Sequence, residues 1–220
     1  VHSIVGEQSD HFFSLVKKTL LENYQKTESE SVLTAPFDTE LFGHWWFEGC
    51  QWLSHILEKI SKDPEVSSST CREYLENFPG GEVVALPEGS WGEGGFHYIW
   101  LNDQNSWTWK KIYAAEERFL GLVKHWYAKG NETATRVLRQ AARELLLLES
   151  SDWQFLITTW SARDYAEERV SYHYDNFQKL CRLVDEINET GKTSEEGREF
   201  LRNCEEKAKI FEDIDLAWWL

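Results

Sequence analysis

A glycine-rich segment, Pro87–Gly95 (PEGSWGEGG), divides the 220-residue chain into two parts with different sequence patterns. Four glycines behind a leading proline within nine residues are typical of a loop, because both residue types interrupt regular structure. We therefore predict two domains, residues 1–86 and 87–220. The pattern on each side of the loop limits what each domain can fold into.

In the first part, apolar runs of helical and strand length alternate. The expected elements, in chain order, are a helix over Ser9–Gln25, a strand over Val32–Phe37 (VLTAPF), helices over Trp45–Ser61 and Thr70–Phe78, and a strand over Glu82–Leu86. The strand Val32–Phe37 is expected to be buried on both faces, and a capping box is expected to open the helix at Thr70. Such alternation is typical of β/α units, but a complete barrel takes about 250 residues. We expect the C-terminal part of a β/α barrel.

The second part is helical almost throughout. The expected helices cover Trp107–Lys129, Glu132–Glu149, a segment after Asp152, Arg163–Glu189 and Ser194–Lys209. Gly130 is placed to end the first of them, and the tail Phe211–Leu220 is expected to be extended and docked through Trp218 and Trp219. The predicted fold class is therefore α/β, as the last units of an incomplete barrel, followed by an all-α domain.

Composition limits the class of partner. The formal net charge of −15 repels nucleic acid and anionic membranes, and no apolar run approaches the roughly 20 residues that span a bilayer. The four cysteines are widely spaced and form no CxxC pair, so we expect reduced thiols and a cytoplasmic protein. The chain opens at Val1 without signal-peptide features, as expected for a piece of a longer protein. A processed secreted protein is the alternative.

Tryptophan is unusually frequent, at 12 of 220 residues. One interpretation is a tryptophan-rich core, since buried tryptophan is common. The other is a sugar-binding cleft, because the apolar face of a pyranose ring stacks on indole. The count alone leaves both open.

The densest group of candidate functional residues is the segment FDTELFGHWWFEG, which follows the first expected strand. It contains Asp38, Glu40, His44 and the pair Trp45 and Trp46. In barrel enzymes the C-terminal ends of strands carry catalytic groups. Cleavage of a glycosidic bond needs a carboxylic acid that protonates the leaving oxygen, and aromatic neighbours favour the protonated form by desolvation. The alternative is that Asp38 only caps the following helix.

This segment resembles the fourth signature region of branching enzymes of glycoside hydrolase family 57. The glycine-rich segment LPEGSWGEGGFHYIWLN is similar to the fifth region of that family, and the stretches ELLLLESSDWQFLITT and FEDIDLAWW resemble its C-terminal domain. The resemblance implies a (β/α)7-type barrel followed by a helical domain. It also implies that Asp38 is the general acid/base and that Trp91 and Trp100 line the glucan cleft.

The catalytic nucleophile of the family is a glutamate in an earlier region that this sequence does not contain. The resemblance therefore implies an inactive chain whose partner is the N-terminal part of the same enzyme. The implied reaction is retaining transfer from an α-1,4 to an α-1,6 linkage, with α-glucans as donor and acceptor. It needs no cofactor or nucleotide, and we find no metal-ligand spacing.

The supporting residues each have two interpretations. Trp91 and Trp100 stack on glucosyl units or pack in the core, and Asp152 binds sugar hydroxyls or caps a helix. His44 contacts substrate or Asp38, or it is a core histidine. Trp45 and Glu40 are further substrate-binding candidates.

Two other functions remain open from the sequence. The first is a hydrolase or 4-α-glucanotransferase of the same family. The second is a non-catalytic, glucan-binding helical module.

Overall fold

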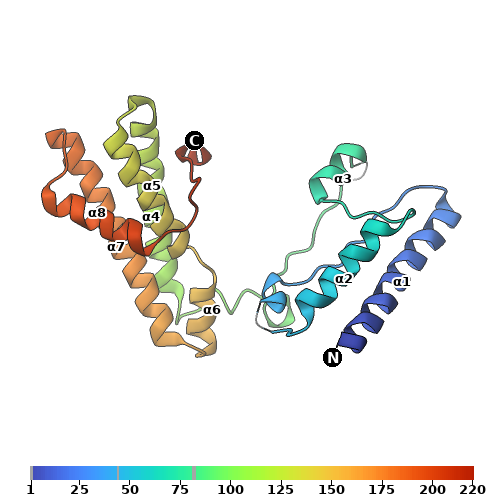
Figure 1. Ribbon diagram of the computed structural model, residues 1–220. Coiled ribbons are helices and arrows are strands. Elements are labelled where there is room, and N and C mark those ends of the chain that lie inside the picture. The colour runs from blue at the N-terminus through green and yellow to red at the C-terminus, as the bar shows by residue number, and fades with distance from the viewer. Residues whose placement is uncertain (1, 44, 81–82) are drawn as a thin grey trace. The chain divides into compact units, whose positions relative to one another are not determined.

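The computed structural model describes residues 2–43, 45–80 and 83–220 (Figure 1). It divides the chain into two compact units, Val1–Ala85 and Leu86–Leu220. The first unit contains α1 (His2–Thr27), the 3-10 helix η1 (Thr39–Phe42), α2 (Gly49–Lys62) and α3 (Cys71–Asn77). The second contains η2 (Glu93–Gly95), α4 (Ser106–Trp126), η3 (Tyr127–Lys129), α5 (Glu132–Leu148), α6 (Asp152–Thr159), α7 (Arg163–Thr190), α8 (Glu195–Lys207) and η4 (Leu216–Trp219).

In the first unit, α1 and α2 lie side by side around a small aromatic core (Figure 1). Trp52 of α2 is buried, and its ring centroid lies 4.9 Å from that of Phe12 and 4.9 Å from that of Trp46. Val5 and Ile56 complete the buried cluster. At the far end of the helix pair, Lys17 Nζ lies 2.7 Å from Asp63 Oδ2 and fixes the end of α2 against α1.

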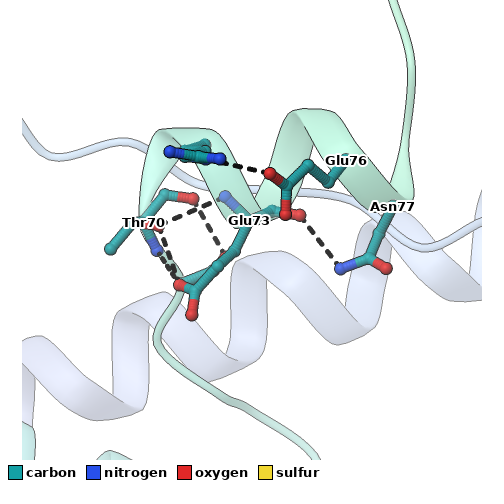
Figure 2. Close-up of polar contacts among 6 residues, drawn as sticks. Thr70, Glu73, Glu76 and Asn77 are labelled. Atoms are coloured by element: carbon teal, nitrogen blue, oxygen red, sulfur yellow. Dashed lines mark hydrogen bonds and ion pairs between the residues drawn. The ribbon is translucent and has the colours of Figure 1, made fainter.

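The helix predicted after Thr70 is confirmed, with the expected capping box (Figure 2). The backbone N–H of Glu73 donates to Thr70 Oγ1 at 3.2 Å, and the backbone N–H of Thr70 donates to Glu73 Oε2 at 2.8 Å. The backbone N–H and the hydroxyl of Thr70 both donate to the Glu73 carboxylate, and these two bonds hold the pKa of that carboxyl below its usual value. The box satisfies two N–H groups that have no partner within the helix.

The two predicted strands do not form. Val32–Phe37 has no strand conformation and is exposed rather than buried on both faces, with Val32 52% and Phe37 44% exposed. Glu82 of the second predicted strand lies outside the described residues, while Val83, Val84 and Leu86 are exposed and not in a strand. A strand requires a neighbour for its N–H and C=O groups, and none of the described residues supplies one. The incomplete barrel therefore remains a prediction.

The second unit has a continuous core, in which α7 packs against α4, α5, α6 and α8. The helical spacing of apolar residues that predicted α5 is confirmed, because Val137, Leu138, Ala141 and Leu145 are all buried. Phe119 of α4 and Phe177 of α7 are fully buried with ring centroids 6.3 Å apart. The predicted helix end at Gly130 is also confirmed, since this glycine has a left-handed φ of 61°.

The tail of the second unit differs from the expected extended segment, because it ends in η4. Ile214 and Leu216 are buried, and the ring of Trp219 lies edge-on to Phe119 at 5.2 Å. Trp218 is exposed and does not dock the tail. Within the described residues, no helix combines the length and apolar character that a membrane crossing requires.

Candidate functional site

The candidate residues fall into two groups, one in each unit. The first group surrounds Asp38, which stands at the N-cap position of η1 with an extended backbone. Its carbonyl oxygen accepts a bond from the N–H of Leu41 at 3.1 Å, but its carboxylate makes no capping hydrogen bond. The side chain is exposed. The structure therefore does not support the alternative that the Asp38 carboxylate caps the helix.

Two phenylalanines hold the turn that carries Asp38. Phe37, immediately before it, lies 5.9 Å from Phe42 and 5.6 Å from Trp52 between ring centroids. Phe42 closes η1 and packs on Trp46 at 5.8 Å. The sequence FDTELF therefore fixes both ends of the turn on the aromatic core, while its polar residues Asp38, Thr39 and Glu40 are exposed.

The other predicted residues of this group differ in position. Glu40 is exposed within η1, and Trp45 is 70% exposed. His44 lies outside the described residues. Trp46 packs in the aromatic core, so the two adjacent tryptophans have different surroundings.

The second group gathers around Phe155 of α6, which the sequence analysis did not single out. The ring centroid of Trp91 lies 6.2 Å from that of Phe155, and the ring centroid of Trp100 lies 6.4 Å from it. Trp91 is 69% exposed, whereas Trp100 is half-buried. The structure thus brings the two predicted tryptophans against one aromatic side chain, and Trp91 keeps most of its ring accessible for stacking.

A polar network fixes the loop that carries both tryptophans. Thr158 Oγ1 of α6 donates to the carbonyl of Ile99 at 2.7 Å and accepts from Asn102 Nδ2 at 2.9 Å and Asn105 Nδ2 at 3.0 Å. Trp109 Nε1 also donates to the carbonyl oxygen of Trp100 at 2.7 Å. Backbone groups of a loop need such partners when they leave water.

Asp152 lies in the first turn of α6, one residue after the N-cap position, which Ser151 occupies. Its Oδ2 accepts a hydrogen bond from Ser150 Oγ at 3.2 Å, and the side chain is exposed. Asp152 is therefore not the helix cap that the alternative interpretation predicted, although a negative charge in this turn favours the helix.

Trp160, directly after α6, is a further exposed aromatic residue that sequence analysis missed. It is 67% exposed and adopts the left-handed backbone region with a φ of 59°, which is uncommon for a bulky side chain. Its Nε1 donates to Gln104 Oε1 at 3.2 Å, and the Arg163 guanidinium lies 4.5 Å from the ring centroid. Both contacts hold the indole in one orientation.

No group of three or more potential metal ligands occurs among the described histidine, cysteine, aspartate and glutamate side chains. The arrangement offers carboxylates and aromatic faces. Those groups suit proton transfer and binding of a neutral sugar.

Comparison with known proteins shows which proteins this chain resembles. Residues 111–219 match the family model described as 1,4-alpha-glucan branching enzyme, C-terminal. The chain is 42% identical over 211 residues to the 1,4-alpha-glucan branching enzyme TK1436 of Thermococcus kodakarensis, covering 96% of this chain and 30% of that protein. The chain thus spans about a third of the length of the curated relatives that it matches.

Solved structures agree. The crystal structure of the GH57-type branching enzyme from Pyrococcus horikoshii matches 99% of this chain and 40% of its own chain, with a TM-score of 0.75 and 41% identity. The crystal structure of the alpha-amylase AmyC from Thermotoga maritima matches 96% of this chain and 38% of its own, with a TM-score of 0.65 and 30% identity. Over nearly its whole length, the chain corresponds to the C-terminal part of GH57-type 1,4-alpha-glucan branching enzymes.

Proposed function

We propose that this chain supplies the acid/base and part of the glucan-binding surface of a 1,4-alpha-glucan branching enzyme. The observation that carries the proposal is the 42% identity over 96% of the chain to a relative named for that activity. The reaction is a retaining transfer of a glucan segment from an α-1,4 to an α-1,6 linkage, as in the synthesis of glycogen-like polymers. Donor and acceptor are both α-glucans.

Asp38 is the proposed general acid/base. A retaining mechanism needs two carboxyl groups roughly 5–5.5 Å apart, one donating a proton to the leaving oxygen and the other forming the covalent intermediate. The geometry of Asp38 supports the first role, because its carboxylate makes no capping bond while Phe37 and Phe42 hold its turn in place. The nucleophile comes from the N-terminal part of the same enzyme. Without that part this chain is inactive.

Exposed apolar segments support the partial barrel. Val32, Leu33, Val83 and Val84 of the first unit are exposed, and so is Leu86, the first residue of the second unit. Contiguous exposed apolar side chains mark surfaces that another part of a protein covers. We propose that residues 1–86 complete a (β/α)7-type barrel, with Val32–Phe37 as a strand whose neighbours lie in the N-terminal part.

Residues 87–220 form the proposed helical domain that delivers aromatic side chains to the glucan. Trp91 and Trp100 stack on glucosyl units above Phe155, and Asp152 binds sugar hydroxyls. Glu40, His44 and Trp45 of the first unit complete the set. Each stacked ring contributes about 1 kcal/mol beyond the area it buries.

A branching enzyme must keep water away from its covalent intermediate, because water competes with the acceptor hydroxyl. Aromatic walls exclude water and still bind the apolar faces of sugars, which is why Trp91 matters for the choice between transfer and hydrolysis. The match to an alpha-amylase keeps a hydrolase, or a 4-α-glucanotransferase, as the second candidate. We also propose a cytoplasmic location, because the widely spaced cysteines suggest reduced thiols.

The decisive experiment replaces Asp38 by asparagine in the complete enzyme. Asp38→Asn should abolish the formation of α-1,6 links, counted in the product after debranching, while the melting temperature stays that of the parent enzyme. The matched control is Asp213→Asn, an exposed aspartate of the second unit, which should branch normally. Full activity of Asp38→Asn would refute the assignment. A parent enzyme that makes only α-1,4 products would favour the second candidate, and an inactive parent that still binds glucan would favour a non-catalytic binding module.

A further inference from the structure

A cavity in the second unit carries an unusual charge for so acidic a chain. It lies between α7 and the segment that leaves α8, and its charged lining residues are Glu168, Arg169, Lys207 and Lys209. Three cations against one carboxylate leave a surplus of two positive charges in the cavity, whereas the chain as a whole has a net charge of −15. Concentrated positive charge in a concave surface attracts anions.

The guanidinium of Arg169 is held in place by a buried relay. Arg169 Nη2 lies 2.7 Å from His173 Nε2, and His173 Nδ1 lies 2.7 Å from Glu144 Oε2. Arginine donates hydrogen bonds and never accepts them. His173 Nε2 must therefore accept, and the imidazole proton is on Nδ1, where it donates to the carboxylate. Since His173 and Glu144 are each 1% exposed, the relay orients Arg169 without help from solvent.

The same guanidinium has unused donors. Its Nε is buried and has no hydrogen-bond partner among the described residues. Nor do those residues place a carboxylate within ion-pair distance of Arg169, Lys207 or Lys209. A buried N–H without a partner is unfavourable because it has lost its hydrogen bonds to water, so a structure normally satisfies it.

The wall that carries the two lysines is also fixed. Arg143 Nε donates to the carbonyl oxygen of Ile210 at 2.8 Å, and Arg143 Nη2 donates to that of Phe211 at 3.3 Å. Lys207 ends α8, where a positive charge is favoured by the helix dipole in any case. Lys209 lies beyond the helix, so the dipole does not account for its place beside the cavity.

We propose that this cavity binds a phosphate group, either as free phosphate or as a phosphate ester. The donor fork of an arginine matches phosphate oxygens, and lysines add point charges that neutralise a dianion. Arg169 binds the anion from the α7 side, and Lys207 and Lys209 bind it from the opposite wall. The site is independent of the sugar-stacking residues that support the proposed function.

The test measures binding of inorganic phosphate to the 220-residue chain by isothermal titration calorimetry, at constant ionic strength. The parent chain should bind one phosphate, and a second series of titrations at higher ionic strength should show weaker binding because salt screens the charges. Lys207→Gln/Lys209→Gln should weaken it about five- to thirtyfold, as expected for two charge-assisted contacts in partly solvated positions. Both lysines are exposed, so the fold should survive.

The matched control is Lys124→Gln/Lys192→Gln, which removes the same charge from exposed positions and includes one lysine in the last turn of a helix. It should leave phosphate affinity within twofold of the parent, a change of about 0.4 kcal/mol. Equal loss of affinity in both double variants would overturn the proposal, as would the absence of saturable binding by the parent chain. A parallel titration with glucose 1-phosphate separates the two sources. Tighter binding than inorganic phosphate supports a phosphate-ester site, and equal binding supports a site for free phosphate.

Discussion

Glu149 should make the stability of the second unit depend on pH. It lies at the C-cap of α5, and its pKa is raised from 4.5 to about 7, first by burial and then by the charge of Glu116 and a hydrogen bond with it. The folded state therefore binds a proton at Glu149 more tightly than the unfolded chain. Stability must fall as pH rises from about 4.5 through about 7, because the unfolded state then loses the proton more readily.

The size of the effect follows from the shift. The pKa of Glu149 rises from 4.5 to about 7, and a difference of one in pKa corresponds to 1.36 kcal/mol. The free energy of unfolding can therefore change by about 3.4 kcal/mol at most. Because the side chain is only partly buried, water screens the repulsion and the expected effect is about 1–2 kcal/mol. Glu149→Gln removes the charge, keeps the shape, and should stabilise the chain by that amount at pH 8 but hardly at pH 4.5.

The measurement is urea unfolding followed by helical circular dichroism, at several pH values between 4.5 and 8. Comparing each variant with the parent at the same pH cancels the titration of all other groups. Glu117→Gln, on the exposed side of α4 next to Glu116, is the matched control and should show no such trend. A Glu149→Gln variant with the same advantage at both ends of the range, or with lower stability than the parent at pH 8, would refute the reasoning.

Three other perturbations test local structure. Thr158→Val removes the hydroxyl bonded to Ile99 and Asn102, so stability should drop by about 1–3 kcal/mol and amide exchange in residues 86–105 should accelerate. Unchanged exchange in these residues would contradict the role of Thr158 in fixing the loop. Trp160→Gly should be about 1 kcal/mol more stable than Trp160→Ala in thermal unfolding, because only glycine adopts its left-handed backbone without strain; equal stability would exclude strain. Thr70→Ala breaks the capping box and should destabilise α3 by about 1 kcal/mol, so the first amides of α3 should exchange faster with solvent. Amide exchange as slow as in the parent would contradict the capping role of Thr70.

The helices of the second unit were predictable because their apolar faces find partners within the same segment of chain. α5 shows this, since the residues spaced for one helical face are the residues that the structure buries against α7. The strand prediction over Val32–Phe37 used an equally real apolar signal, but a strand is defined by pairing with another segment. Apolar composition indicates that such a segment is buried, but it does not indicate which other segment covers it.

The sequence predicted those candidate site residues that lie within distinctive local motifs. Asp38, Trp91 and Trp100 stand in distinctive local sequences, so they could be singled out one by one. Phe155 and Thr158 could not, because their roles depend on contacts with residues more than 50 positions away along the chain, such as Trp91 and Asn102. Trp160 gave no signal either, since its left-handed backbone is set by the end of α6.

The two units differ in how much of their function the chain itself determines. The second unit buries Phe119 and Phe177 completely and fixes its tryptophan loop by hydrogen bonds of its own. The first unit fixes the turn of Asp38 by local aromatic packing but leaves the carboxylate exposed. A general acid works best when desolvation keeps it protonated near neutral pH. The position of the proposed acid is thus encoded in these residues, whereas its desolvation must come from the surface that covers it in the complete enzyme.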